Sequence, residues 1–195
     1  MRDKLRTILV ILLIIAGTGA GLAKSTPGSI PQPRPKPFLE AALQAATMTP
    51  PAPRIAASGL PVPRWVSVRA GRVNVRRGPA MDQDVVWTYV RAGVPVEIIA
   101  EFDTWRRVRD ASGETGWVKE QMLDGRRNVL VTGRVNTAIL NSPKAEAEVV
   151  AYAAPGLQAQ LVNCRGEWCE ISARGFDGYV SRDRLWGVYG EETVK

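Results

Sequence analysis

Two cysteines are the most reactive side chains in the sequence. Cys164 and Cys169 flank the four residues Arg-Gly-Glu-Trp, a spacing that places two cysteines opposite each other on strands joined by a tight turn. A disulfide closing so short a loop would stabilise a small domain by about 2 kcal/mol. A metal or redox site is the alternative, but the pair has neither a third ligand nor a CxxC spacing. The sequence therefore predicts a structural disulfide.

Histidine is absent from all 195 residues. This removes the usual general base, the usual partner of a serine or cysteine nucleophile and the commonest transition-metal ligand. No two acidic residues stand in a context that suggests acid–base chemistry, and no phosphate-binding loop occurs. We therefore expect no enzyme, no catalytic residue, no cofactor and no metal site.

Aromatic and arginine side chains are the candidate binding residues. Six tryptophans outnumber three phenylalanines, and large flat side chains suit both small cores and binding grooves. Guanidinium groups suit carboxylates, so arginines around an aromatic groove predict an acidic ligand. The expected ligand-binding residues are Trp87, Tyr89, Trp105, Arg106, Arg107 and Trp168, with Arg76, Arg77 and Arg109 around the same groove.

A structural role stays open for each of these side chains. Trp105 and Trp168 each follow a turn that starts a strand, and strand alternation places them opposite Val108 and Ile171, outside the core. The two tryptophans could equally cap the open end of a barrel. Any one arginine could be a solvated surface charge.

An internal repeat predicts the architecture that positions these residues. Blocks at 73–79, 93–99, 105–108 and 116–118 recur at 138–143, 156–162, 168–171 and 178–180. Apolar residues alternate within the blocks, and glycine, proline, asparagine or aspartate bound them, which is typical of short antiparallel strands. About five such strands close best as a small barrel. We predict an all-β fold with two tandem barrels at 64–127 and 128–190 and a tail at 191–195.

The two copies differ at the positions of the expected disulfide and of two expected ligand-binding residues. At the cysteine positions the first copy has Glu101 and Arg106, which predicts an opposite-charge pair across the same two strands. Trp87 and Tyr89 are replaced in the second copy by Ala151 and Ala153. The loss of two aromatic residues suggests that only the first copy binds strongly.

The amino-terminal third predicts export and a tether. Residues 1–23 contain a basic segment, a short apolar run and small residues ending at Ala23, as in a signal peptide cleaved after Ala23. An uncleaved membrane anchor is the alternative. Residues 24–63 hold ten of the fourteen prolines, a composition expected of a disordered, semi-rigid linker. The folded part is therefore expected to be periplasmic or secreted, where disulfides persist.

Residues 64–190 resemble tandem bacterial Src homology 3 (SH3b) domains, in particular those of exported proteins with paired copies. The resemblance rests on Arg72-Val-Asn-Val-Arg-Arg-Gly-Pro79, Gly93-Val-Pro-Val-Glu-Ile-Ile99, Gly116-Trp-Val118, Cys164-Arg-Gly-Glu-Trp-Cys169 and Leu185-Trp-Gly-Val-Tyr189. It implies two SH3-like barrels and a module that docks peptides or cell-wall peptide stems. The second copy departs from the pattern because Asn136-Thr-Ala-Ile-Leu-Asn-Ser-Pro143 lacks the arginine and glycine.

These features together predict a non-catalytic exported binding module or envelope scaffold. Its expected partner is a cell-wall peptide or an envelope protein. The alternative is an interaction domain for proline-rich segments, including its own Pro31–Pro37. The net charge of +7 comes without a Lys/Arg-rich helix or an RNA-binding signature, so no nucleic-acid partner is expected.

Overall fold

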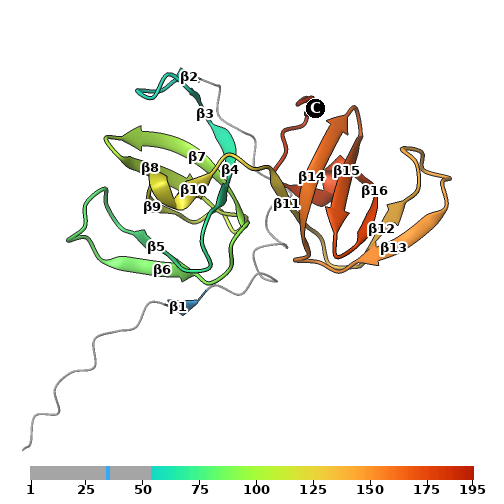
Figure 1. Cartoon of the computed structure of the whole chain (residues 1–195), viewed down its shortest axis with the longest axis horizontal. Helices are drawn as coiled ribbons and strands as arrows, with labels where there is room; N and C mark the ends of the chain where they lie inside the picture. Colours follow the sequence, from blue (N-terminus) through green and yellow to red (C-terminus); the bar gives the residue numbers. More distant parts are fainter. Residues whose placement is uncertain (1–33, 36–53) are drawn as a thin grey trace, which may run out of the picture. The chain divides into compact units, whose positions relative to one another are not determined.

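The computed structural model describes residues 34–35 and 54–195 (Figure 1). The expected signal peptide and most of the expected linker lie outside these residues. Within them, no helix is long and apolar enough to cross a membrane. The described secondary structure consists of strands and two single-turn 3-10 helices, η2 (Glu120–Met122) and η3 (Arg182–Arg184). The predicted all-β fold is confirmed.

The first sheet has the strand order β1-β6-β5-β9-β8-β7-β4-β10. All its neighbours are antiparallel except β1, which pairs in parallel with β6. The strands are β1 (Arg34–Pro35), β4 (Arg64–Val68), β5 (Val73–Arg76), β6 (Val85–Tyr89), β7 (Pro95–Phe102), β8 (Trp105–Arg109), β9 (Thr115–Lys119) and β10 (Leu123–Asp124).

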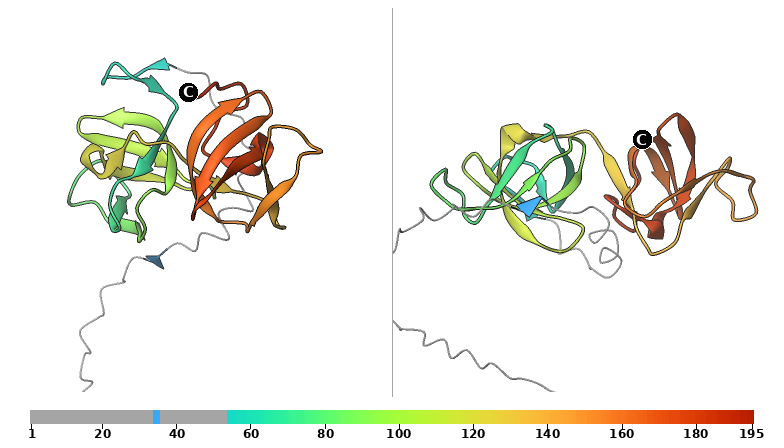
Figure 2. Two further views of the ribbon diagram at one scale, coloured as in Figure 1. Left: turned by 45° about the vertical axis from the view of Figure 1, so that its right-hand side comes forward. Right: turned by 90° about the horizontal axis from the view of Figure 1, so that it is seen from below.

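The second sheet repeats this arrangement in the order β13-β12-β16-β15-β14-β11-β17. Figure 2 shows each sheet curling into its own barrel. The strands are β11 (Asn128–Val131), β12 (Thr137–Leu140), β13 (Val149–Ala153), β14 (Gln158–Arg165), β15 (Trp168–Ala173), β16 (Phe176–Ser181) and β17 (Leu185–Trp186).

The repeat extends to the irregularities of the strands. The pairing of β5 with β6 shifts after Val75, and that of β12 with β13 shifts after Ile139. Such bulges turn a strand and help a sheet to close. Alternate apolar residues fill each barrel, as Val73 and Val75 do in β5. Each copy is thus a complete small barrel with its own core.

A short hairpin precedes the expected start of the first barrel. It consists of β2 (Arg54–Ile55) and β3 (Pro61–Val62). Val62 is 2% exposed and belongs to the core of the first barrel. Proline-rich composition hides this hairpin in the sequence, because its strands have only two residues each.

The two barrels share a third apolar cluster. Trp65 of β4 lies edge-on to Trp186 of β17, with ring centroids 4.6 Å apart. Ala111 and Leu130 complete the buried cluster, and Tyr189 packs against it. With only residues 125–127 between β10 and β11, the second barrel packs directly on the first.

Candidate ligand-binding groove

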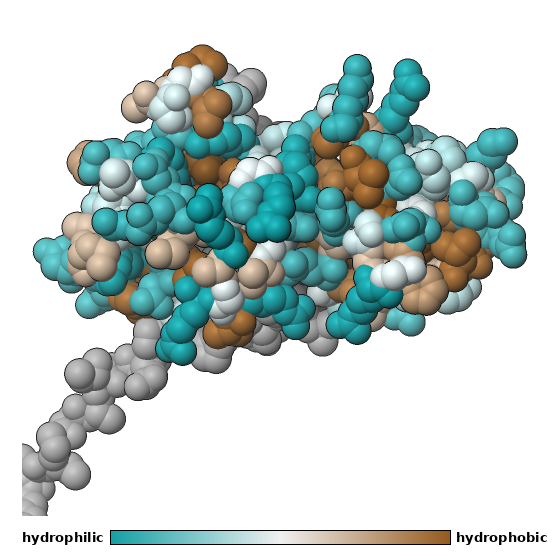
Figure 3. Space-filling view, in the orientation of Figure 1, coloured by the Kyte–Doolittle hydropathy of each residue, from teal (hydrophilic) through white to brown (hydrophobic). Residues whose placement is uncertain are grey.

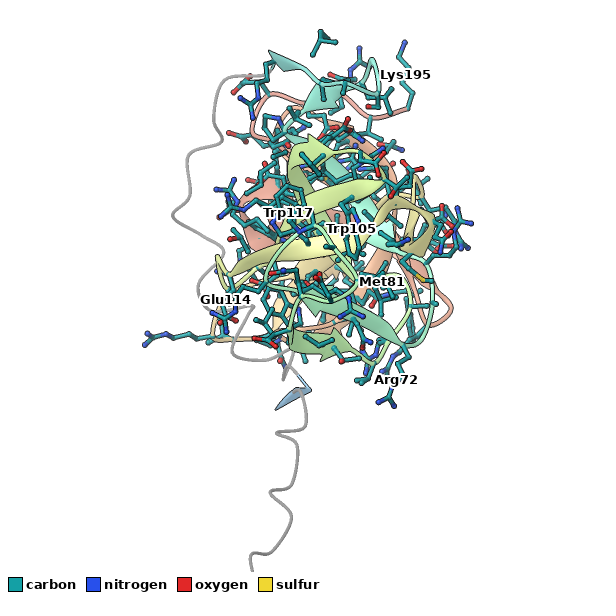
Figure 4. The ribbon with its side chains drawn as sticks, turned by 90° about the vertical axis from the view of Figure 1, so that its left-hand side faces the viewer. Arg72, Met81, Trp105, Glu114, Trp117 and Lys195 are labelled. Carbon is teal, nitrogen blue, oxygen red and sulfur yellow. A yellow bond between two sulfur atoms is a disulfide. The ribbon has the colours of Figure 1, made fainter. Side chains whose placement is uncertain are left out.

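A groove of about 360 Å³ opens on the first barrel. It lies where the start of β5, the β5–β6 loop, the start of β8 and the end of β9 with η2 come together. Its wall includes the apolar parts of Trp105, Met81 and Met122 and the cations Arg72, Arg76 and Lys119. Figure 4 views this face, with Trp105 and Met81 beside each other and Arg72 toward one end.

Trp105 forms the aromatic wall of the groove. It is 6% exposed and does not belong to the core cluster of the barrel, whereas Val108, three residues later, does. Lys119 is the cross-strand partner of Trp105, and its Nζ atom lies 5.5 Å from the centroid of the ring. An ammonium group over an indole face is attracted by the ring quadrupole. The sheet register therefore brings a cation and an aromatic ring together at one end of the barrel.

The described lining carries positive charge only. Arg72, Arg76 and Lys119 contribute three cations, and no aspartate or glutamate is among the lining residues. Arg76 donates a hydrogen bond from Nη1 to the carbonyl oxygen of Gln83 at 2.6 Å, which holds the guanidinium against the β5–β6 loop. A groove with fixed cations and a flat apolar wall suits a small ligand with a carboxylate group.

Trp87 and Tyr89, expected in the groove, lie in the core of the first barrel. They are 5% and 4% exposed, and their rings meet edge to face at 6.3 Å. Burial is the main cause that raises the pKa of Tyr89 well above its ordinary value, so the phenol stays neutral. Both side chains pack in the core, and neither lines the groove.

Arg106 and Arg107 point to different surroundings. Arg106 is buried and pairs with Glu101, at 3.4 Å, and with Glu120. Arg107 is exposed and donates a hydrogen bond to the hydroxyl of Thr115 at 3.1 Å. The predicted cross-strand pair of Glu101 and Arg106 is thus present. Because its guanidinium is buried and paired with carboxylates, Arg106 stabilises the barrel.

The other arginines of the expected groove are also held elsewhere, apart from Arg76. Arg109 binds the buried carboxylate of Glu97, with a hydrogen bond of 2.8 Å from Nε. Arg77 lies 3.8 Å from Asp84 on the surface. Sequence reasoning missed Arg72 and Lys119 because their proximity depends on the pairing of strands distant in sequence. Two signals were available, because Arg72 opens the Arg72–Pro79 motif and Lys119 directly follows the Gly-Trp-Val block.

The second barrel lacks the cations of the groove. Trp168 corresponds to Trp105 and is half-buried, and Cys164 and Cys169 form the predicted disulfide beside it. Ser181 pairs with Trp168 as Lys119 pairs with Trp105. At the positions of Arg72 and Arg76 the second copy has Asn136 and Leu140. The chemical character of the groove therefore belongs to the first barrel.

No group of three or more His, Cys, Asp or Glu side chains that could hold a metal ion occurs in the described part of the chain. Cys164 and Cys169 are its only cysteines, and the disulfide uses both.

Comparison with known proteins finds a matching family and a similar bacterial protein. The sequence profile of the family described as bacterial SH3 domain matches residues 69–125 and 133–187. The chain is 23% identical over 126 residues to a putative N-acetylmuramoyl-L-alanine amidase, YrvJ, of Bacillus subtilis. That match covers 60% of this chain and 24% of the amidase.

Two solved structures are also similar, NlpC1 and NlpC2 from Trichomonas vaginalis. Both are 15% identical to the chain, with TM-scores of 0.31 and 0.29. The matches cover 73% and 64% of this chain and 48% of each of the two structures. The chain therefore spans about a quarter of the curated relative and about half of these structures.

Proposed function

This chain belongs to the bacterial SH3 domain family, and from that premise we propose that it is a non-catalytic, exported module that binds cell-wall peptide stems through the groove of its first barrel. The second barrel serves as a structural partner that fixes the first. The proline-rich segment before residue 54 sets the reach of the pair from the membrane or from a partner protein.

The observation that carries this proposal is the composition of the groove. Arg72, Arg76 and Lys119 surround the apolar wall of Trp105 without any acidic residue in the lining. Wall peptide stems are short and carry free carboxylates, so they match both the size and the charge of such a groove. The amidase similar to this chain is named for the N-acetylmuramoyl-L-alanine linkage, which supports a ligand from the wall.

Export is part of the same proposal. The leader at 1–23 has the order of a secretory signal, and the Cys164–Cys169 disulfide suits an oxidising compartment such as the periplasm. The absence of histidine from the sequence favours binding over hydrolysis.

Co-sedimentation with purified peptidoglycan sacculi tests the proposal. The full chain should sediment with sacculi, and the double variant Arg72→Glu/Lys119→Glu should lose at least about nine-tenths of that retention, because two attractive charges become repulsive. Lys144→Glu/Arg165→Glu makes the same change in net charge with two exposed residues of the second barrel, and it should be retained like the wild type. Equal retention of both double variants would rule out the groove.

A second candidate function is recognition of proline-rich segments, beginning with the chain's own. It is favoured by one observation, the parallel pairing of β1 (Arg34–Pro35) with β6 at Trp87 and Thr88. Deletion of residues 24–53 separates the two functions. Wall binding should be unchanged if the segment is a plain tether, and it should strengthen if the segment competes with the ligand.

A further inference from the structure

Equivalent strands of the two barrels, β6 and β13, differ in what lies at their outer edge. β6 and β13 occupy equivalent places at the side of β5 and β12, and the registers agree residue by residue: Val85 pairs with Arg76 as Val149 pairs with Leu140, and Tyr89 pairs with Val73 as Ala153 pairs with Thr137. What one edge binds is therefore a guide to what the other can bind.

The β6 edge is extended by another strand. β1 (Arg34–Pro35) pairs with it in parallel, with Arg34 opposite Trp87 and Pro35 opposite Thr88. Proline has no backbone N–H group to donate. It therefore suits an edge strand, because one side of that strand pairs with no other strand. Thr88 is 5% exposed and donates a hydrogen bond to Asn74 at 2.9 Å.

The β13 edge has no such strand among the described residues, since β13 stands at the end of its sheet. Three of its five side chains are exposed: Val149 is 40%, Val150 41% and Tyr152 68% exposed, whereas Ala153 is buried. Figure 3 shows hydrophobic surface at this side of the second barrel. Tyr152 takes the place of the buried Thr88. A bare apolar edge strand readily accepts another strand.

Both edges begin with two carboxylates in the same places. Asp82 and Asp84 precede β6, and Glu146 and Glu148 precede β13, each pair exposed. The segment Pro31–Pro37 has four prolines at alternate positions, the cations Arg34 and Lys36, and no acidic residue. Exposed carboxylates thus precede both edge strands, and the segment of the sequence that contains β1 is cationic.

We infer that the outer edge of β13 is a second docking site, which takes an extended, cationic, proline-containing segment of a partner protein as an added strand. The site differs from the wall-binding groove, which is in the other barrel and carries the opposite charge. The intramolecular contact of β1 with β6 is the pattern for this intermolecular one.

A labelled peptide with the sequence of residues 29–39 is the probe, added to the full chain and followed by fluorescence anisotropy. The chain's own segment competes for β6 at a high effective concentration, so the added peptide reports on β13. Saturable binding with one peptide per chain is expected. Glu146→Lys/Glu148→Lys should weaken it at least about tenfold, while the matched Asp82→Lys/Asp84→Lys should change it less than about twofold.

Val150→Lys/Tyr152→Lys changes exposed residues only, so it should keep the fold while abolishing peptide binding. The inference is overturned if no saturable binding occurs up to about 1 mM peptide, or if this variant and Glu146→Lys/Glu148→Lys bind as the wild type does. It is also overturned if the chain instead dimerises through this edge, seen as a dimer in sedimentation equilibrium that Val150→Lys/Tyr152→Lys removes. Loss of peptide binding would leave retention on sacculi unaffected, so the two proposals fail separately.

Discussion

The hydroxyl of Tyr189 in the second barrel donates a hydrogen bond of 2.9 Å to the carboxylate of Glu97 in the first. Glu97 is 1% exposed and is also bound by Arg109. The ring of Tyr189 packs on Trp65 at 5.4 Å. Burial, followed by the neighbouring charge of Glu97, raises the pKa of Tyr189 far above its ordinary value, so this donor keeps its proton. A polar contact therefore fixes the apolar contact between the barrels.

Tyr189→Phe should destabilise the pair of barrels. It removes one hydrogen bond to a buried, charged acceptor, and the expected loss is about 1.5–3 kcal/mol in the free energy of unfolding. Urea denaturation measures it. Tyr152→Phe removes an exposed hydroxyl and should change stability by less than about 0.5 kcal/mol. Equal stability of Tyr189→Phe and wild type would show that the contact contributes nothing.

The disulfide should stabilise only the second barrel. Cys164 and Cys169 close a loop with a sequence separation of 5. For a loop of this length, chain entropy predicts that reduction lowers the free energy of unfolding by about 2 kcal/mol. Unfolding followed by hydrogen exchange, with and without reductant, resolves the two barrels. Faster exchange confined to the second barrel's strands is expected. If reduction speeds exchange equally in both barrels, the disulfide also stabilises the first barrel through the interface between them.

Stability should fall in acid partly because of Glu101. Its side chain is 2% exposed, and burial alone would raise its pKa, but hydrogen bonds from Arg64 and Ser58 and the charge of Arg106 outweigh burial and lower the pKa. A lowered pKa in the folded state stabilises the fold above the unfolded-state pKa of about 4.3, and this contribution is lost as the pH falls through the folded-state value.

The test for Glu101 is a series of urea denaturations between neutral pH and acid. Glu101→Gln cannot titrate, so it should be less stable than the wild type at pH 7 and should lose less stability on acidification. Glu146→Gln, at an exposed position, is the control and should follow the wild type. An unchanged acid profile for Glu101→Gln would refute this role.

The sequence predicts features that depend on local pattern and repetition. Alternating apolar residues and the offset between copies are enough for the two barrels. The spacing of Cys164 and Cys169 predicts their disulfide, and the offset places Glu101 and Arg106 at the equivalent positions. Trp105 is predicted to lie outside the core because it stands three residues from Val108 on one strand. Each of these inferences needs only strand geometry.

The lining of the groove and the contact between barrels depend on non-local geometry. Trp87 and Trp105 look alike in sequence, yet one fills the core and the other lines the groove. Arg106 and Arg109 bind buried carboxylates, whereas Arg72 and Lys119 come to one groove through the pairing of β5 with β9, which are far apart in the sequence. The repeat predicts the partner of Arg106, but no pattern in the sequence indicates that Arg109 binds Glu97.

The most direct test of wall-peptide binding is a calorimetric titration of the full chain with a soluble wall peptide stem, in its free-acid form and with every carboxylate amidated. If the cations around Trp105 bind the ligand, the free acid should bind, its affinity should fall as salt rises, and the amidated peptide should bind at least about tenfold more weakly, a loss of about 1.4 kcal/mol. Equal affinity for the two forms would contradict an acidic ligand in this groove.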